Sequence, residues 1–387
     1  MDTTISPEAP RARAYFEKLS TVSFAEAHRL KKKYGSPLLA LSRSRARASY
    51  QSLTRALPNV RIFYAIKSNP HPDILKTLKE EGASFEVASY GELKQIMQFG
   101  VLARDILNTQ PFLSEYDFTQ CYKAGQRWFI FDNADQLTRL TCGTNDIDLL
   151  LRLSFPNRNC QVDLSYKFGA TIKEAPELIK SAVATGARVH GVSFHVGSQS
   201  YTTKNYLKAL VAVRRLFDQL QHEGILLDTV DIGGGFPVPY TCPLPSIEHF
   251  ALPIRRKLYE LFPGMNICAE PGRFICGLAQ TLITSVNGKN IRRGVPWYYL
   301  DDGVYNSFSG KVYDHCVYSI LTEGTGTYAK SVLAGPTCDS FDIVSEDIML
   351  PHLEIGDILL VPAMGAYSNV SSTTYNGFSQ AKIIAID

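Results

Sequence analysis

Five short patches of this 387-residue sequence carry side chains that could act together on one substrate. The first is Lys67, an amine at the end of the apolar, strand-like run 63–66. The other four follow in order and offer a flat ring, backbone N–H groups, a carboxylate and a thiol. They are 195–198 (His-Val-Gly-Ser), 233–235 (Gly-Gly-Gly), 270–273 (Glu-Pro-Gly-Arg) and 335–339 (Gly-Pro-Thr-Cys-Asp).

Lys67 and the glycines indicate how a cofactor could be held. A lone lysine after an apolar run is usually a strand-end charge, so the later patches carry the prediction that its amine forms a Schiff base with an aldehyde. Gly234 and Gly235 belong to a turn after a strand, where missing Cβ atoms let N–H groups converge on a phosphate. A bare run of glycines is otherwise only a flexible turn. Further contacts to the same anion could come from Ser198, Arg273 and Tyr367.

Glu270, His195 and Cys338 would complete the chemistry. A carboxylate beside a pyridine nitrogen keeps that nitrogen protonated, which makes the ring an electron sink suited to loss of CO2. His195 would stack on the ring, since metal ligation would need partner ligands that the sequence does not place nearby. Cys338 would be an accessible thiol that protonates the carbon after CO2 leaves, although one cysteine among eight is more often buried and inert. Pyridoxal 5′-phosphate is the cofactor that uses this whole set, and no metal is expected.

The composition is that of an ordinary globular enzyme. The net charge is +3, and the basic stretches 29–33 and 43–47 lie in helix-like segments, which favours solvated helix faces over nucleic-acid binding. The eight cysteines form no CxxC pair and are typical of reduced thiols. No apolar signal core and no apolar run of about 18 residues is present. We therefore expect a cytoplasmic protein that acts on a small molecule and binds neither nucleic acid nor membrane.

Short apolar runs alternate with amphipathic stretches between about residues 37 and 275, which predicts parallel strands with helical crossovers. About eight such units without a GxGxxG motif favour a closed (β/α)8 barrel of the TIM type. The chemical residues end these strands, where barrel active sites are built. The expected helices include 72–81, 90–99, 175–185 and 204–223. The expected strands are 38–41, 62–66, 84–87, 106–108, 129–131, 149–153, 189–194, 229–232 and 266–269.

The pattern changes after about residue 276 to short strands separated by Gly, Pro and Asp turns, with little helix. We predict a barrel over residues 37–275 and a second, all-β domain of Greek-key type over residues 1–36 and 276–387. Part of the first 36 residues would pair with this β domain. Its expected strands are 280–286, 297–300, 312–317, 330–334, 358–361 and 381–386.

The patches, in this order, resemble the eukaryotic-type ornithine decarboxylases of the fold type III, alanine racemase-like group of pyridoxal-phosphate enzymes. The resemblance extends from about residue 37 to the end of the chain. It implies that Lys67 bears the cofactor, His195 stacks on its ring, Glu270 binds the pyridine nitrogen and Cys338 is catalytic. It also implies a head-to-tail homodimer with shared active sites. The remaining cofactor-binding positions that it implies are Glu86, Glu92, Arg152, Ser198, Gly234, Gly235, Arg273 and Tyr367.

Substrate choice rests on two aspartates. Ornithine-specific members of the family place one carboxylate after the catalytic cysteine and another in a Tyr-Asp-His segment, and these positions fall on Asp339 and Asp314. A terminal ammonium entering a closed site needs a matching negative charge because its desolvation is otherwise too costly. Diaminopimelate decarboxylases carry a glutamate after the cysteine, so Asp339 argues against that substrate.

The sequence departs from the family pattern at three points. Glu86 stands where many ornithine decarboxylases have aspartate, and the segment 108–112 lacks the lysine that commonly follows its proline. The chain is also shorter than animal homologues and shows no C-terminal degradation tail, as expected of a bacterial-sized enzyme or one without that regulation.

The leading hypothesis is decarboxylation of L-ornithine to putrescine and CO2. L-Lysine differs by one methylene, worth about 1–3 kcal/mol in an apolar pocket, and the sequence does not rank the two. Arginine, diaminopimelate or a carboxylated polyamine are alternative substrates. A catalytically inactive regulatory homologue, like the antizyme inhibitors, is a hypothesis of another class, and the intact Lys67, Glu270 and Cys338 speak against it.

Overall fold

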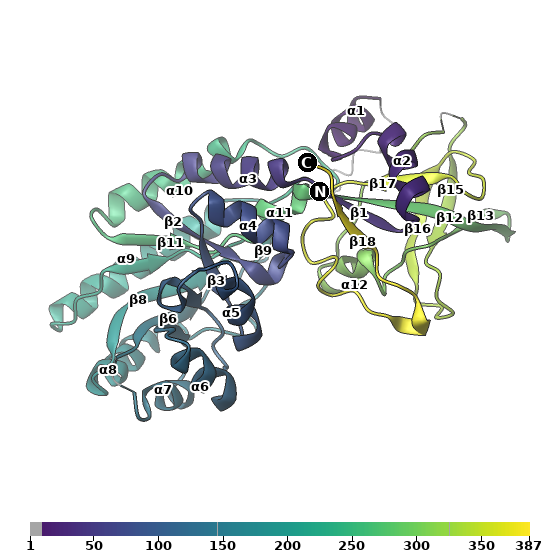
Figure 1. Ribbon diagram of the computed structural model, residues 1–387. Helices are drawn as coiled ribbons and strands as arrows, with labels where there is room; N and C mark the ends of the chain where they lie inside the picture. Colours follow the sequence, from purple (N-terminus) through teal and green to yellow (C-terminus); the bar gives the residue numbers. More distant parts are fainter. Residues whose placement is uncertain (1–9, 145, 325) are drawn as a thin grey trace. The chain divides into compact units, whose positions relative to one another are not determined.

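The computed structural model describes residues 10–144, 146–324 and 326–387. The chain divides into two compact units, a barrel unit and a β unit (Figure 1). The barrel unit comprises residues 50–237 and 245–274, and the β unit comprises residues 1–49, 238–244 and 275–387.

The barrel unit is built on a closed ring of eight parallel strands in the order β10-β11-β2-β3-β4-β5-β6-β8. Helices lie around the outside of these strands in Figure 1. The predicted (β/α)8 barrel is therefore confirmed. Its strands are β2 (Val60–Ala65), β3 (Ser84–Val87), β4 (Leu107–Asn108), β5 (Trp128–Phe131), β6 (Asp148–Ser154), β8 (Arg188–His195), β10 (Thr229–Asp231) and β11 (Asn266–Ala269).

The barrel strands are short and apolar because both faces are covered. Four side chains, Phe63, Leu107, Ile130 and Leu150, form a buried cluster inside the ring. Several of the surrounding helices begin after a serine or asparagine whose side chain accepts a backbone N–H of the first turn. The helices are α3 (Arg43–Ala56), α4 (Pro72–Glu80), α5 (Tyr90–Met97), α6 (Glu115–Lys123), α7 (Ala134–Thr141), α8 (Ala175–Ala184), α9 (Lys204–His222), α10 (Ile247–Leu261) and α11 (Arg273–Cys276).

One expected barrel strand belongs to the other sheet. The run 38–41 forms β1 (Leu38–Leu41), which pairs antiparallel with β12 (Gln280–Arg292) and parallel with β18 (Lys382–Ala385). All four residues of β1 are buried, and an apolar run of this kind looks the same in any covered sheet. The barrel unit also contains an unpredicted antiparallel pair, β7 (Cys160–Val162) with β9 (Ser198–Ser200).

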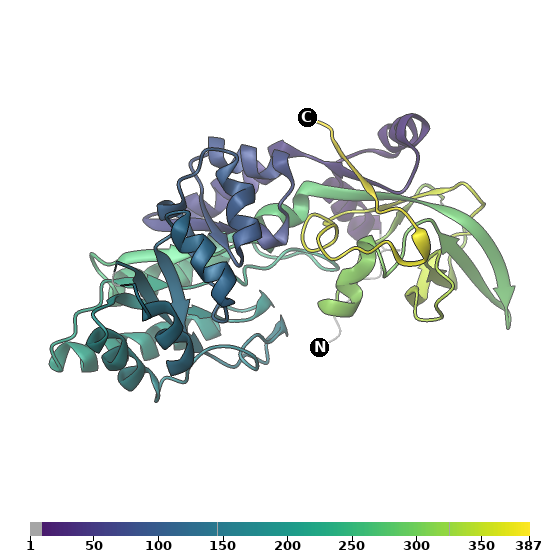
Figure 2. The ribbon, with the colours of Figure 1, turned by 60° about the horizontal axis from the view of Figure 1, so that its bottom comes forward.

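The β unit is built on one mixed sheet in the order β14-β17-β12-β13-β15-β16, with β1 and β18 added through β12. Strand β12 is a long curved ribbon, drawn in green in Figure 2. Its buried half packs into clusters that include Leu282 and Val286. The other strands are β13 (Val295–Leu300), β14 (Leu321–Thr322), β15 (Ala329–Ala334), β16 (Ile343–Leu350) and β17 (Ile358–Val361).

The β unit differs from its prediction in three places. The segment 312–317 is not a strand. Its first two residues belong to the short helix α12 (Gly310–Tyr313), and the rest form a loop. Strands β14 and β16 were not expected. In their described part, the first 36 residues do associate with the β unit, but as helices: α1 (Pro10–Leu19) and α2 (Phe24–Tyr34), whose Phe16 and Ala27 are buried in its core with Ile283.

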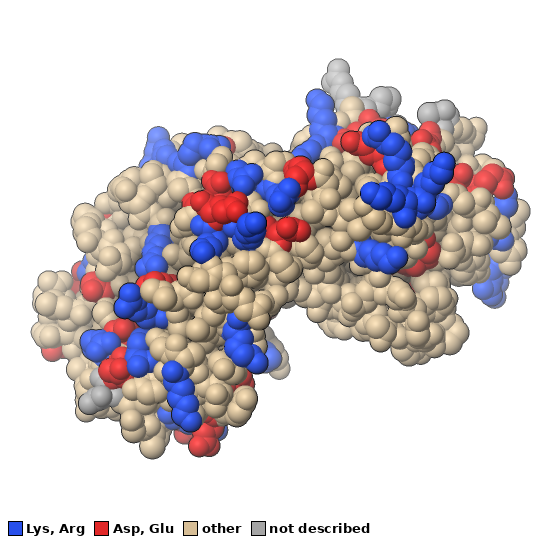
Figure 3. All heavy atoms as spheres, viewed as in Figure 1, with Lys and Arg blue, Asp and Glu red and all other residues tan. Residues whose placement is uncertain are grey.

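The surface carries mixed charge. On the face seen in Figure 3, acidic and basic side chains are interspersed. The basic stretch 29–33 lies in α2, where Lys31 Nζ donates to Gly356 O at 2.8 Å. Among the described residues, no helix combines the length and the apolar character needed to cross a bilayer.

Candidate active site

The predicted cofactor-binding residues of the barrel unit lie where its parallel strands end. Lys67 lies in the single turn η1 (Ile66–Ser68) that follows β2, and Glu86 lies in β3 one residue before its end. Arg152 and His195 belong to the last residues of β6 and β8, and Glu270 follows β11 directly. Because all eight strands are parallel, these side chains gather at one rim of the barrel.

Lys67 forms an ion pair with a fully buried carboxylate. Its Nζ lies 2.9 Å from Oε2 and 3.1 Å from Oε1 of Glu86, and the lysine side chain remains 43% exposed. Burial raises the pKa of Glu86, and the charge of Lys67 opposes that rise. The Thr109 hydroxyl lies 2.5 Å from Glu86 Oε1. Glu86 therefore holds the amine of Lys67 in place, while the partly exposed lysine side chain remains accessible to a small molecule.

Glu270 is a buried carboxyl group with polar neighbours on several sides. Thr109 Oγ1 lies 3.0 Å from its Oε2, and Ser193 Oγ lies 3.4 Å from its Oε1. Burial raises the pKa of Glu270 well above its usual value, and the neighbouring carboxyl of Asp231 adds to the rise. A buried carboxyl group that binds a proton this readily could share one with a ring nitrogen.

His195 presents a neutral ring. Burial, followed by the positive charges of Arg152 and Lys67, lowers its pKa to about 3. Its Nδ1 accepts the Gly197 N–H at 3.0 Å, so the proton of the neutral imidazole resides on Nε2. A flat, uncharged, fixed ring of this kind can stack on an aromatic cofactor without competing for its proton.

The glycine turn leaves backbone donors free. Gly233 and Gly235 have φ of +65° and +104°, and a Cβ at either would lie 2.2 Å or 2.5 Å from a carbonyl oxygen. The carbonyls of Gly234 and Gly235 accept from Tyr206 Oη at 2.7 Å and Ser200 N at 2.9 Å. Within the described chain, the N–H groups of Gly234 and Gly235 donate no hydrogen bond, so both remain available to an anion.

Ser198 and Arg273 extend this anion site. Arg273 Nη2 lies 3.1 Å and Nε 3.3 Å from Ser198 Oγ, and the guanidinium is buried. Arg273 begins α11 directly after Pro271 and Gly272. A hydroxyl, a guanidinium and free N–H groups are the donors that phosphate monoesters require.

Arg152 and Glu92 lie in the surroundings of these groups. The Arg152 guanidinium carbon lies 5.6 Å above the Phe168 ring, and its charge acts on both His195 and Glu270. Glu92, in the first turn of α5, accepts the Ala88 N–H at 2.6 Å, and burial raises its pKa.

The other predicted residues belong to the β unit. Cys338 is exposed, and both its thiol and its N–H lie near Asn376 Oδ1, at 3.2 Å and 3.1 Å. Asp339 Oδ1 accepts the Phe341 N–H at 3.0 Å, and its Oδ2 accepts the Tyr305 hydroxyl. These two contacts lower the pKa of Asp339. The two residues share one loop and line a cavity of about 750 Å³ in this unit.

Asp314 and Tyr367 lie elsewhere in the β unit. Asp314 caps the end of α12, and Tyr367 has a left-handed φ of +60°. Neither residue lines the cavity that Cys338 and Asp339 share. The Tyr367 carbonyl accepts from the hydroxyls of Ser309 and Ser371.

The turn that carries Cys338 is held by a residue that the sequence analysis missed. Asp342 is buried and accepts the N–H groups of Val304 at 2.8 Å and Thr337 at 3.0 Å. Its carbonyl also accepts the Gly335 N–H at 2.8 Å. Asp342 therefore fixes both ends of the turn.

Thr109, Asp231 and Ser193 were also missed, and all three touch the buried carboxyls of the barrel. Each comes at or near the end of a barrel strand, which is the signal that could have found them. Their side chains are small and common, however, so only their placement in the ring distinguishes them.

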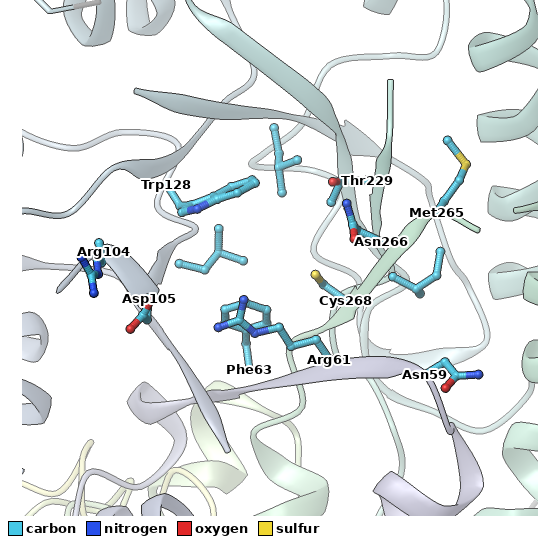
Figure 4. A pocket seen from close by; sticks show the side chains of 13 residues that line it. Asn59, Arg61, Phe63, Arg104, Asp105, Trp128, Thr229, Met265, Asn266 and Cys268 are labelled. Atoms are coloured by element: carbon cyan, nitrogen blue, oxygen red, sulfur yellow. The ribbon is translucent and has the colours of Figure 1, made fainter. Parts of the chain in front are cut away.

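At the end where its strands begin, opposite to this rim, the barrel has a cavity of about 380 Å³ (Figure 4). Arg104 and Asp105 lie at one side of this cavity, and the Arg61 guanidinium lies 4.7 Å from the centre of the Phe63 ring. Burial raises the pKa of the Cys268 thiol in this cavity, which makes it a poor nucleophile. The chemistry therefore belongs to the rim where the strands end.

The carboxyl-end rim has the groups that one particular cofactor needs. Free N–H donors beside a serine and an arginine suit a phosphate, and an accessible lysine suits an aldehyde. The buried Glu270 on the same rim suits a pyridine nitrogen. Fold and site together define a pyridoxal-phosphate-dependent enzyme of the alanine racemase-like architecture.

Comparison with known proteins leads to the family. The family model described as "Pyridoxal-dependent decarboxylase, pyridoxal binding domain" matches residues 43–277. The lysine/ornithine decarboxylase of Selenomonas ruminantium is 39% identical over 368 residues, which cover 95% of this chain and 93% of that protein. The chain belongs to the fold type III pyridoxal-phosphate-dependent decarboxylases that act on ornithine, lysine and arginine. It is a decarboxylase of basic amino acids.

Solved structures and one further relative widen the comparison. The lysine/ornithine decarboxylase of Vibrio vulnificus complexed with cadaverine matches with a TM-score of 0.89 and 40% identity, over 95% of this chain and 100% of that chain. The arginine decarboxylase of Paramecium bursaria Chlorella virus bound to agmatine matches with a TM-score of 0.85 and 29% identity, over 90% of this chain and 97% of that chain. Antizyme inhibitor 2 of Xenopus laevis is 33% identical, over 85% of this chain and 76% of that protein.

Proposed function

We propose that the enzyme decarboxylates L-ornithine to putrescine and CO2, and that it also accepts L-lysine. The observation that carries the basic side-chain preference is Asp339, which directly follows Cys338 in the sequence. Its carboxylate accepts the Phe341 N–H and the Tyr305 hydroxyl, and these contacts lower its pKa. An aspartate held ionised can offset the charge of a terminal ammonium when that group leaves water.

Acceptance of lysine has its own support. The relatives from Selenomonas ruminantium and Vibrio vulnificus, at 39% and 40% identity, are both named lysine/ornithine decarboxylases. Since one methylene changes binding by about 1–3 kcal/mol, a site that accepts one diamino acid accepts the other at a reduced rate.

In the proposed reaction each barrel residue has one task. Pyridoxal phosphate, when bound, supplies an electron sink for the pair left behind as CO2 departs. Lys67 binds the aldehyde carbon, and Ser198, Gly235 and Arg273 bind the phosphate. Glu270 holds a proton at the ring nitrogen, and His195 restrains the ring from one face.

The β-unit residues act on the substrate. The bond between the α-carbon and the carboxyl carbon breaks, and the α-carbon must then receive a proton to give the amine. We assign this proton to the Cys338 thiol, which Asn376 Oδ1 orients through contacts to both Sγ and N. Asp339 and Asp314 bind the distal ammonium, and Tyr367 adds a donor to the phosphate.

The proposal includes a homodimer in which the Cys338–Asp339 loop of one subunit completes the site of the other. It also places the enzyme in the cytoplasm, which suits eight cysteines that form no disulfide. Sedimentation and fractionation of the native host cell test these two parts separately.

The central test measures kcat/KM on L-ornithine, L-lysine, L-arginine and meso-diaminopimelate with the cofactor-saturated enzyme. We expect the highest kcat/KM for ornithine and the second highest for lysine. The values for arginine and diaminopimelate should be at least about tenfold lower. A preference for arginine or diaminopimelate would reject the substrate assignment. Absence of turnover on all four, despite a bound cofactor absorbing in the visible, would support an inactive regulator instead.

A further inference from the structure

Asp231 is a buried carboxyl group at the barrel rim to which the proposed reaction gives no task. It ends β10, and Glu270 follows β11, the neighbouring strand. Asp231 is fully buried, and its Oδ1 accepts the Gly233 N–H at 2.9 Å. Its Oδ2 is buried too, yet within the described chain no N–H or O–H donor reaches it.

The group that faces Asp231 is the carboxyl of Glu270. The two carboxyl groups lie at the ends of neighbouring strands and act on each other: Asp231 raises the pKa of Glu270, and Glu270 lowers that of Asp231. Two buried carboxylates side by side repel one another, and they can share a hydrogen bond only if one of them carries a proton. The same proton satisfies Asp231 Oδ2, whose burial without a donor is otherwise costly.

The groups that act on Asp231 most strongly are Glu270, Gly233 N–H, Ser193 and Glu86, and none of them is positive. Lys67 and Arg152 act on Glu270 instead. Asp231 thus adds negative charge beside Glu270, and no positive group is among its own strongest neighbours.

We infer that Asp231 is a positioning residue that shares a proton with Glu270 and, by its charge, keeps the ring nitrogen of the bound cofactor protonated. If the cofactor is bound, the proton shared by the two carboxyl groups would be available to its ring nitrogen, and the negative charge left on Asp231 and Glu270 would favour the protonated ring. The inference rests on the proposed role of Glu270 and extends it to a second residue that does not touch the cofactor.

A merely structural role for Asp231 is the competing explanation, because its Oδ1 also fixes Gly233 at the start of the phosphate turn. Asp231→Asn separates the two roles. The asparagine keeps an oxygen for the Gly233 N–H, but its NH2 donates to Glu270 and stabilises the ionised glutamate without adding charge. Asp231→Ala removes both functions. Asp302→Asn, at a fully buried aspartate of the β unit, is the matched control for loss of a buried carboxylate.

The experiment compares pyridoxal 5′-phosphate with its 1-deaza analogue, which has carbon in place of the ring nitrogen. Each compound is bound to full-length protein from which the original cofactor has been removed, and the ratio of the two Kd values is measured. We expect Asp231→Asn to reduce the preference for the natural cofactor by about tenfold or more, the effect of one pKa unit, while the affinity for the analogue stays within about threefold. Asp302→Asn should leave the ratio unchanged.

If Asp231→Asn weakened the binding of both ligands equally, or left the ratio of their Kd values unchanged, the inference would be overturned. Asp231 would then have only the structural role of fixing Gly233 in the phosphate turn. The variant Glu270→Gln distinguishes failure of the Asp231 inference from failure of the proposed function. If Glu270→Gln keeps the wild-type ratio, the Glu270 role itself fails; if it abolishes the preference and Asp231→Asn does not, only the Asp231 inference fails.

A second measurement does not depend on the variant at Asp231. The cofactor-free wild-type protein at neutral pH should show the infrared carbonyl band of a protonated carboxyl that disappears in Glu270→Gln. A wild-type spectrum identical to that of Glu270→Gln in this region would mean that no proton is shared, and would overturn the inference even if Asp231→Asn failed to fold.

Discussion

Lys67 Nζ lies 2.9 Å from Oε2 of the fully buried Glu86, so the amine that is proposed to bind the cofactor is tied to the end of the neighbouring strand. Glu86 is one methylene longer than the aspartate that many ornithine decarboxylases carry at this point. The extra length allows both of its carboxylate oxygens to reach the amine, at 2.9 Å and 3.1 Å.

Lys67→Ala should remove nearly all turnover and leave the fold intact, because the lysine side chain is 43% exposed. Borohydride reduction followed by mass spectrometry should find the cofactor on Lys67 of the wild type and nowhere on the variant. Lys76→Ala, at an exposed position of α4, is the control. A variant with wild-type turnover and a reducible cofactor adduct would contradict the assignment.

Glu270→Ala should slow decarboxylation by about a hundredfold, on the order of 3 kcal/mol, because the ring nitrogen loses its anionic partner. The measurement is kcat at saturating cofactor, normalised to folded protein by thermal melting. A purely structural glutamate would lower the melting temperature and spare kcat.

Cys338→Ala should impair product formation more than substrate binding, since the thiol is assigned a proton transfer that follows CO2 loss. Protonation at the wrong carbon should then yield a transaminated aldehyde and pyridoxamine phosphate. Asn376→Ala should show a weaker form of the same defect, because Asn376 Oδ1 contacts both Sγ and N of Cys338. Normal turnover without the side product would leave Cys338 without a catalytic role.

Asp339→Ala and Asp314→Ala should each raise KM for ornithine by at least about tenfold, because the distal ammonium loses a counter-charge. A neutral amino acid of similar length should lose nothing comparable, which makes it the control substrate. Mixing Asp339→Ala with Lys67→Ala subunits should restore partial activity if the site is shared across a dimer. Unchanged KM for every diamino acid in both variants would end the basic-substrate assignment.

The lowered pKa of His195 should make the stability of the protein depend on pH. Its pKa is lowered to about 3 in the fold from a usual value of 6.5, so the unfolded chain binds the extra proton first as the pH falls. Stability should therefore decrease below about pH 6.5, by at most about 1.4 kcal/mol per pH unit. Urea unfolding of the wild type and of His195→Gln between pH 7 and pH 5 isolates this contribution. Parallel curves for the two proteins would contradict it.

The sequence by itself determined the barrel and the main chemical positions of its rim. Strands that alternate with helices leave parallel pairing as the simplest way to bury their apolar runs, so strand ends such as Lys67 and His195 were predictable from local pattern. It also determined the order of the motifs that relate the chain to its family.

Only the tertiary structure decided which side chains meet across the barrel. Thr109 reaches Glu270 over 161 positions of sequence, and Asp231 pairs with Glu270 because β10 and β11 are neighbours in the ring. Strand β1 shows the same limit, since its apolar run fits either sheet and only its pairing with β12 places it in the β unit. Local periodicity records which face of an element is buried, whereas the partner against which it is buried depends on how the whole chain closes.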